Sequence, residues 1–167
     1  LRPFKFWTYT SSLLHSLCYL SVKSNTFLYH LVNVVLHSLN TILVFLFLRL
    51  FFKIWPSFLA ACLFAVHPIH TEAVSWISGK PYIILSLFIL GNLLLYYYAT
   101  NPSVKEKKTK TTYFVFSLFI FAYFIINNYG FYFTFPLFLV LFDLSLKTGK
   151  KNWKFWIPFF CIDITRL

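Results

Sequence analysis

The chain is poor in negative charge and has no methionine. Only four of its 167 residues are Asp or Glu, and charged residues of both signs make up 11%, whereas soluble globular proteins have about 25%. Hydrophobic residues reach 59%, aromatic residues reach 23%, and the mean hydropathy is +0.72. A soluble domain could not bury so much apolar surface, so the composition predicts an integral membrane protein.

Other scarcities exclude several kinds of active site. Four glycines form no glycine-rich phosphate-binding loop, and there is no nucleophile elbow or close pair of carboxylates. The cysteines Cys18, Cys62 and Cys161 have no metal-binding or redox spacing. We therefore expect no certain cofactor, with a divalent cation as an open alternative, and catalysis by these residues alone is poorly supported.

The positive charge is concentrated in two short segments. The formal net charge is +11, and eight of the lysines belong to these segments: Lys105, Lys107, Lys108, Lys110, Lys147, Lys150, Lys151 and Lys154. Each segment follows an apolar run, which is typical of cytoplasmic loops in membrane proteins. We expect no nucleic-acid partner, because no domain is left outside the bilayer to bind one.

The apolar runs predict an all-α fold, a polytopic transmembrane helix bundle of about five spans including short or broken ones. We expect spans at residues 27–52, 56–66 and 82–99, and a helix hairpin at 113–146 that turns at 127–130. Residues 56–66 are too few to cross alone, since about twenty are needed. The helix must therefore continue past Pro68 or break there beside a cavity.

The remaining segments are more polar. We expect residues 1–26 to form an interfacial or extracytoplasmic segment, with an amphipathic helix at 9–22, and residues 100–112 to form a loop. The chain starts at Leu1 rather than Met and stops shortly into an apolar run from Phe155. We therefore expect residues 1–167 to be one transmembrane domain and a piece of a longer protein.

Four polar side chains fall within about 80° on one face of the first expected span. They are His30, Asn33, His37 and Asn40. They could bind a neighbouring helix or line a polar cavity. With the lysine-rich loops cytoplasmic, His30, residues 67–80 and the turn at Asn127 all lie on the opposite, extracytoplasmic side.

The most informative segment contains His67, His70, Glu72 and Lys80. Such polar residues between apolar runs are costly unless they face water or a protein cavity. The histidines and Glu72 could cap a broken helix, face a substrate or bind a metal. We expect no metal site, because Pro68 disrupts the helical spacing and no third ligand is identifiable.

Two cations could contact a phosphate, and one acid has a simpler expected role. Lys80 could hold a lipid phosphate as a point charge or simply extend to the headgroups. Arg2 could bind a phosphate through two hydrogen bonds. We expect Asp143 to pair with Lys147 one helical turn later and to carry no chemistry.

Two motifs together resemble a known family. Residues 29–40 (YHLVNVVLHSLN) and 64–80 (FAVHPIHTEAVSWISGK) resemble the membrane O-mannosyltransferase-like proteins with C-terminal tetratricopeptide repeats and their bacterial relatives. The Arg2-Pro3 pair and residues 135–143 look like further elements of the family. The resemblance implies a GT-C type fold with its active site on the outer face. It also implies that a first span with an acidic loop precedes Leu1 and that repeats follow Leu167.

The chain departs from the family at two places. Lys80, Pro81 and Tyr82 stand where the family usually has Arg followed by Asp, and residues 127–130 replace a Lys-Glu pair. Lysine does not reproduce the two-pronged hydrogen bonding of arginine to phosphate. Both departures weaken the expected binding of the donor.

The resemblance implies a glycosyltransferase that moves a mannose-like hexose from a polyprenyl- or dolichyl-phosphate donor to a protein or glycan hydroxyl. The bilayer would be the bacterial inner membrane, or the endoplasmic reticulum membrane in a eukaryote. We expect Glu72 to act in catalysis and the other selected residues to bind substrate: His67, His70, Lys80, Arg2, His30 and Asn33. The alternatives are a transporter or channel subunit with a polar His/Asn/Glu path, and a non-catalytic scaffold.

Overall fold

A computed structural model describes residues 12–13, 16–17, 19–20, 26–76, 79–101, 106–126, 134–145 and 149–164. Its elements are α2 (Thr26–Leu48), α3 (Ile54–Val66), η1 (Pro68–His70), α4 (Thr71–Ser75), α5 (Lys80–Thr100), α6 (Lys107–Ile126), α7 (Thr134–Ser145) and α8 (Gly149–Ile164). The described part of the chain contains no strand. The prediction of an all-α membrane helix bundle is confirmed.

The chain divides into two compact units, Leu1–Gly91 and Asn92–Leu167. The boundary falls inside α5, so the first part of this helix belongs to one unit and the second part to the other. Each unit has its own helix packing. The expectation of a single domain over residues 1–167 stays a prediction.

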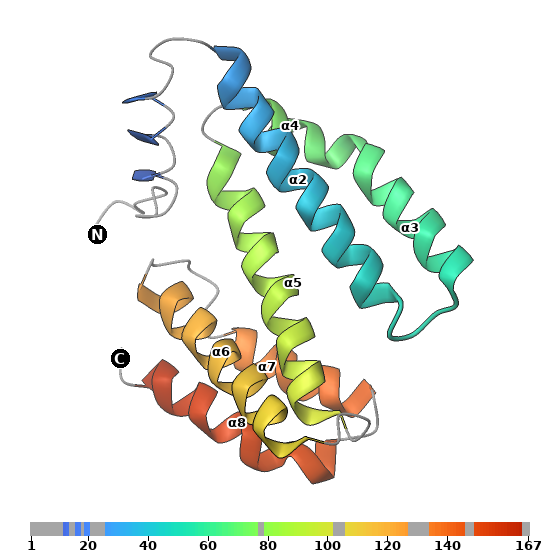
Figure 1. The fold of residues 1–167 in the computed structure, drawn as a ribbon, viewed down its shortest axis with the longest axis vertical. Helices are drawn as coiled ribbons and strands as arrows, with labels where there is room; N and C mark the ends of the chain where they lie inside the picture. The colour runs from blue at the N-terminus through green and yellow to red at the C-terminus, as the bar shows by residue number, and fades with distance from the viewer. Residues whose placement is uncertain are drawn as a thin grey trace. The chain divides into compact units, whose positions relative to one another are not determined.

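The first unit is built on a hairpin of α2 and α3. Figure 1 shows α3 returning alongside α2, and the two helices are in contact. In the turn between them, the Arg49 guanidinium donates to the Phe52 carbonyl at 3.0 Å. Pro56 lies in the first turn of α3, where its missing N–H leaves no helical hydrogen bond unmade.

The helix that begins at Ile54 breaks at Pro68, which decides between the two alternatives for residues 56–66. Pro68 has no N–H to donate to the Phe64 carbonyl, and the His67 N–H contacts that oxygen instead at 3.4 Å. The chain then bends by 45° into η1 and α4. His70 and Glu72 therefore lie on short helical turns beyond the break.

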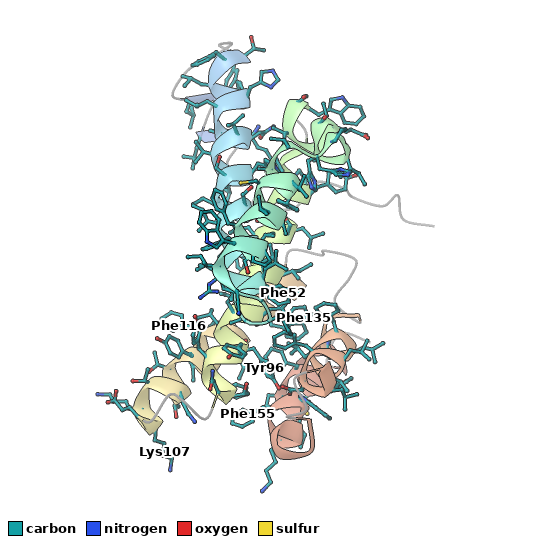
Figure 2. The ribbon with its side chains drawn as sticks, turned by 90° about the vertical axis from the view of Figure 1, so that its right-hand side faces the viewer. Phe52, Tyr96, Lys107, Phe116, Phe135 and Phe155 are labelled. Carbon is teal, nitrogen blue, oxygen red and sulfur yellow. The ribbon has the colours of Figure 1, made fainter. Side chains whose placement is uncertain are left out.

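The second unit has an aromatic core. The rings of Phe121, Phe135 and Phe159, from α6, α7 and α8, lie with centroids 5.1 to 6.3 Å apart. Phe159 is completely buried. The ring of Tyr96 from α5 also packs on Phe159, with 6.0 Å between the centroids. Figure 2 labels Tyr96 and Phe135.

Buried polar contacts join the helices of this unit. The Asn92 side-chain amide donates to the Ser117 carbonyl at 3.1 Å, and the Ser117 hydroxyl donates back to the Asn92 amide oxygen. The Asp143 carboxyl oxygen accepts from the Tyr96 hydroxyl at 2.5 Å and the Trp156 indole N–H at 2.7 Å. The predicted Asp143 partner, Lys147, lies outside the described residues.

By length and composition, α2 and α5 could cross a membrane, and α3 with the bent segment Pro68–Ser75 could form a third span. The sequence predicted about five. Helix α6 starts at Lys107, within the predicted loop 100–112, and its first turn is rich in lysine. The apolar part of α7 covers only Phe135–Leu144. These two helices therefore fall short of the usual apolar length.

Two other predictions concern segments that are only partly described. Six residues of the expected helix at 9–22 are described, and all six are helical. The turn expected at Asn127 lies outside the described residues, although α6 and α7 end and begin on either side of it. An amphipathic helix at 9–22 and a turn at 127–130 stay predictions.

Candidate functional site

A pocket lies where the broken helix meets the start of α5. Its volume is about 280 Å³, and it is lined by Ile69, Glu72, Ala73, Trp76, Gly79 and Tyr82. Glu72 supplies the one acidic side chain of this lining. Trp76 and Tyr82 are 57% and 49% exposed, so both rings stand at the rim. The pocket thus combines a carboxyl group with two accessible aromatic surfaces.

Gly79 makes this meeting possible because of a close backbone approach. A Cβ atom at position 79 would lie 2.1 Å from the Ala73 carbonyl oxygen, far inside van der Waals contact. The Gly79 N–H donates to the Trp76 carbonyl at 3.0 Å. The glycine therefore lets the end of α4 and the start of α5 form adjacent pocket walls.

The polar face of α2 binds backbone carbonyls of the later segments. Asn33 donates to the carbonyls of Val74, at 3.0 Å, and Trp76, at 2.7 Å. Asn40 donates to the Ile83 carbonyl of α5 at 2.8 Å. Both asparagines are buried. Of the two alternatives for this face, these contacts support binding to neighbouring helices.

His37 compensates for the break at Pro68. In an unbroken helix the Ala65 carbonyl would accept from the Ile69 N–H, but that N–H donates to the His67 Nδ1 at 3.2 Å. The His37 Nε2 lies 3.1 Å from the Ala65 oxygen. Because a carbonyl can only accept, this contact places a hydrogen on Nε2.

The two motif histidines lie at the break rather than in the pocket. His67 caps η1 through the same Nδ1 contact. The His70 ring packs between Phe64, at 4.3 Å between centroids, and His37, at 5.2 Å. Among the described residues, no three His, Cys, Asp or Glu side chains are arranged to hold a metal ion.

Lys80 and His30, two other predicted substrate-binding residues, do not line the pocket. Lys80 is 1% exposed, and its ammonium lies 5.0 Å from the centre of the Tyr29 ring, a typical cation–π distance. Lys80 was expected at an outer edge, but its side chain is buried together with the Tyr29 ring. His30 is half-buried on α2, and Arg2 lies outside the described residues.

Trp76 and Tyr82 are the pocket residues that sequence reasoning missed. The signal that could have found them is two large amphipathic rings close to Glu72, the one acid among residues 1–105. Such rings are common at membrane interfaces for reasons unrelated to a substrate. The structure brings them together around one pocket.

We expect Asn33→Leu to loosen the pocket wall. The change keeps the side-chain size but removes both donors to α4 and its end, at a cost of about 1–2 kcal/mol. Faster amide hydrogen exchange across residues 71–76 should result, measured in detergent by mass spectrometry. The control is Ser38→Ala, which removes only a bond to the Val34 carbonyl within α2. Equal exchange in both variants would contradict the bracing role of Asn33.

Known proteins are similar to parts of this chain. Protein O-mannosyl-transferase TMTC3 of Mus musculus is 37% identical over 101 residues, covering 60% of this chain and 11% of the relative. TMTC2 of Homo sapiens is 46% identical over 74 residues, covering 43% and 9%. TMTC1 of Homo sapiens is 42% identical over 89 residues, covering 48% and 10%.

The matched region is thus about a tenth of the length of these relatives. No family model and no solved structure matches the chain. The resemblance read from the two motifs is confirmed by these relatives, while a relation to bacterial proteins stays a prediction. Over about half of its length, the chain is homologous to the TMTC group of protein O-mannosyl-transferases.

Proposed function

We propose that this chain is part of an integral membrane glycosyltransferase. The protein would transfer a mannose-like hexose from a polyprenyl- or dolichyl-phosphate donor to a protein or glycan hydroxyl on the extracytoplasmic face. The observation that carries the proposal is the pocket whose lining includes Glu72, Trp76 and Tyr82. The names of the relatives, protein O-mannosyl-transferases, support the same reaction class.

The pocket suits a hydroxylated, partly apolar group. A carboxylate accepts hydrogen bonds from hydroxyls, and exposed aromatic rings offer apolar surfaces against which the C–H face of a sugar can pack. A volume of about 280 Å³ is at the small end for ligand sites. It suits one sugar ring or one acceptor side chain better than an extended glycan.

Glu72 would act as the base that removes the proton of the acceptor hydroxyl. A departing lipid phosphate would also need cationic stabilisation. Lys80 is buried against Tyr29, so direct phosphate contact by Lys80 would need a rearrangement of the start of α5. Arg2, and an acidic loop that the resemblance implies before Leu1, remain the other proposed contributors.

The test is Glu72→Ala in the full-length protein that contains this chain. We expect transfer of labelled mannose from dolichyl-phosphate mannose to protein to fall by about 10²–10⁴-fold, with an unchanged amount of protein in the membrane. The matched control is Glu106→Ala, which removes an exposed acid outside the pocket. Near-normal transfer by Glu72→Ala would remove Glu72 from the reaction.

A further inference from the structure

The second unit carries a shallow groove along the first half of α6. Its volume is about 530 Å³, and it is lined by Lys107, Lys108, Thr111, Thr112, Val115 and Phe116. Figure 2 shows Lys107 at the beginning of this helix and Phe116 further along it. The lining changes from cationic through hydroxyl-bearing to apolar along the helix axis.

At the cationic end of the groove, positive charge exceeds negative charge. The N-terminus of a helix carries a partial positive charge, so lysines in the first turn are repelled by it. The first turn of α6 holds no acid, and the preceding Glu106, which accepts a hydrogen bond from the Thr109 hydroxyl at 2.5 Å, supplies one negative charge against two lysines. Lys107 and Lys108 are exposed and have no acidic partner among the described residues. A bound anion would offset the repulsion between the two ammonium groups and their repulsion by the helix N-terminus.

The hydroxyls of the two threonines in the groove do not donate to a bound anion. The Thr111 and Thr112 hydroxyls donate to the carbonyls of Lys107 and Lys108, each at 3.0 Å. Their hydrogens are thus already used within the helix. Charge recognition in the groove therefore depends on the two ammonium groups.

The apolar end distinguishes this groove from a site for a soluble anion. Phe116 is 57% exposed, and the next residue on this side, Phe119, is 69% exposed. A free phosphate or nucleotide would use the cationic end of the groove and leave its apolar end without a matching group. An anionic lipid has a phosphate and an acyl chain that match the two ends in the same order.

We propose that this groove binds one anionic phospholipid, with its phosphate on Lys107 and Lys108 and an acyl chain along Val115 and Phe116. The inference is independent of the proposed transfer reaction, since no residue of the Glu72 pocket takes part. It also concerns a defined site rather than a general attraction of a basic loop to a charged bilayer.

The test uses the full-length protein reconstituted in phosphatidylcholine bilayers that contain a minor fraction of phosphatidylglycerol. Native mass spectrometry after gentle extraction counts the lipids retained. We expect phosphatidylglycerol to be retained in preference to phosphatidylcholine, and Lys108→Gln to weaken its binding about fivefold. Lys110→Gln is the matched control, because it makes the same charge change on the same helix but Lys110 does not line the groove.

Two further arms separate a bound lipid from a bound free anion. Phe116→Ser should weaken phosphatidylglycerol retention, and excess inorganic phosphate should not displace the lipid. Equal weakening by Lys108→Gln and Lys110→Gln would show diffuse attraction and overturn the proposal. Displacement by phosphate alone, or equal retention of both lipids by the unmodified protein, would overturn it as well.

Discussion

We expect Gly79→Ala to destabilise the first unit by about 3 kcal/mol. The added Cβ would lie 2.1 Å from the Ala73 carbonyl oxygen, and a backbone atom cannot rotate away as a side chain can. Overpacking in tight sites costs about 1–3 kcal/mol, and a backbone clash belongs at the upper end. The midpoint of thermal unfolding in detergent should fall, and the pocket at Glu72 should lose its shape.

Gly91→Ala is the matched control for this change. Gly91 lies inside α5, the helix that begins directly after Gly79, and an added Cβ there meets no atom within 4 Å. Alanine is preferred to glycine inside a helix by about 0.5–1 kcal/mol, so this variant should be as stable as the unmodified protein or slightly more stable. If Gly79→Ala were as stable as Gly91→Ala, the close approach of Gly79 to the Ala73 carbonyl would be refuted.

The second large effect is expected for Asp143→Ala, which would destabilise the second unit by about 2–5 kcal/mol. Asp143 is buried, and one of its carboxyl oxygens accepts from both Tyr96 and Trp156. Its removal leaves the buried Tyr96 hydroxyl and the half-buried Trp156 indole N–H without this acceptor, at about 1–3 kcal/mol for a buried donor. Thermal unfolding in detergent, followed by tryptophan fluorescence, would report the loss.

Two further variants, Asp143→Asn and Ser117→Ala, provide smaller expected losses of stability for comparison. Asparagine keeps one acceptor oxygen, so Asp143→Asn should lose less stability than Asp143→Ala. Ser117→Ala breaks a neutral pair with Asn92, and such side-chain contacts between membrane helices average about 0.6 kcal/mol. A loss for Asp143→Ala no larger than that of Ser117→Ala would refute the joining role of this carboxyl group.

The apolar runs of the sequence predicted the helices well because apolar length determines where a chain can cross a bilayer. The expected spans at 27–52, 56–66 and 82–99 correspond to Thr26–Leu48, Ile54–Val66 and Lys80–Thr100. The break at Pro68 followed from the missing N–H of proline. The loop at 100–112 was partly wrong, because α6 starts at Lys107. A polar composition indicates exposure, and lysine is also a good helix former.

The candidate site was less predictable, because it depends on contacts between distant segments. Glu72 was selected as a lone acid in an apolar region, and it lines the pocket. Lys80 was selected by its charge, but nothing local indicated that it would be buried against Tyr29, fifty-one positions earlier on α2. The bonds of Asp143 to Tyr96 and Trp156 likewise join three helices. Whether these placements carry the predicted roles rests on the variants above.

The polar face of α2 also has a consequence for how the protein is made. During synthesis α2 emerges before the carbonyls that its His37 and Asn40 side chains bind: Ala65 follows His37 by 28 residues, and Ile83 follows Asn40 by 43. In hydrocarbon an unpaired amide or imidazole is costly, so a solitary α2 would enter the bilayer at a disadvantage. The translocation machinery would favour release of α2 together with α3, which satisfies His37 first. The Asn33 and Asn40 side chains would then remain without these acceptors until α4 and α5 are made. The first unit would therefore assemble in a fixed order.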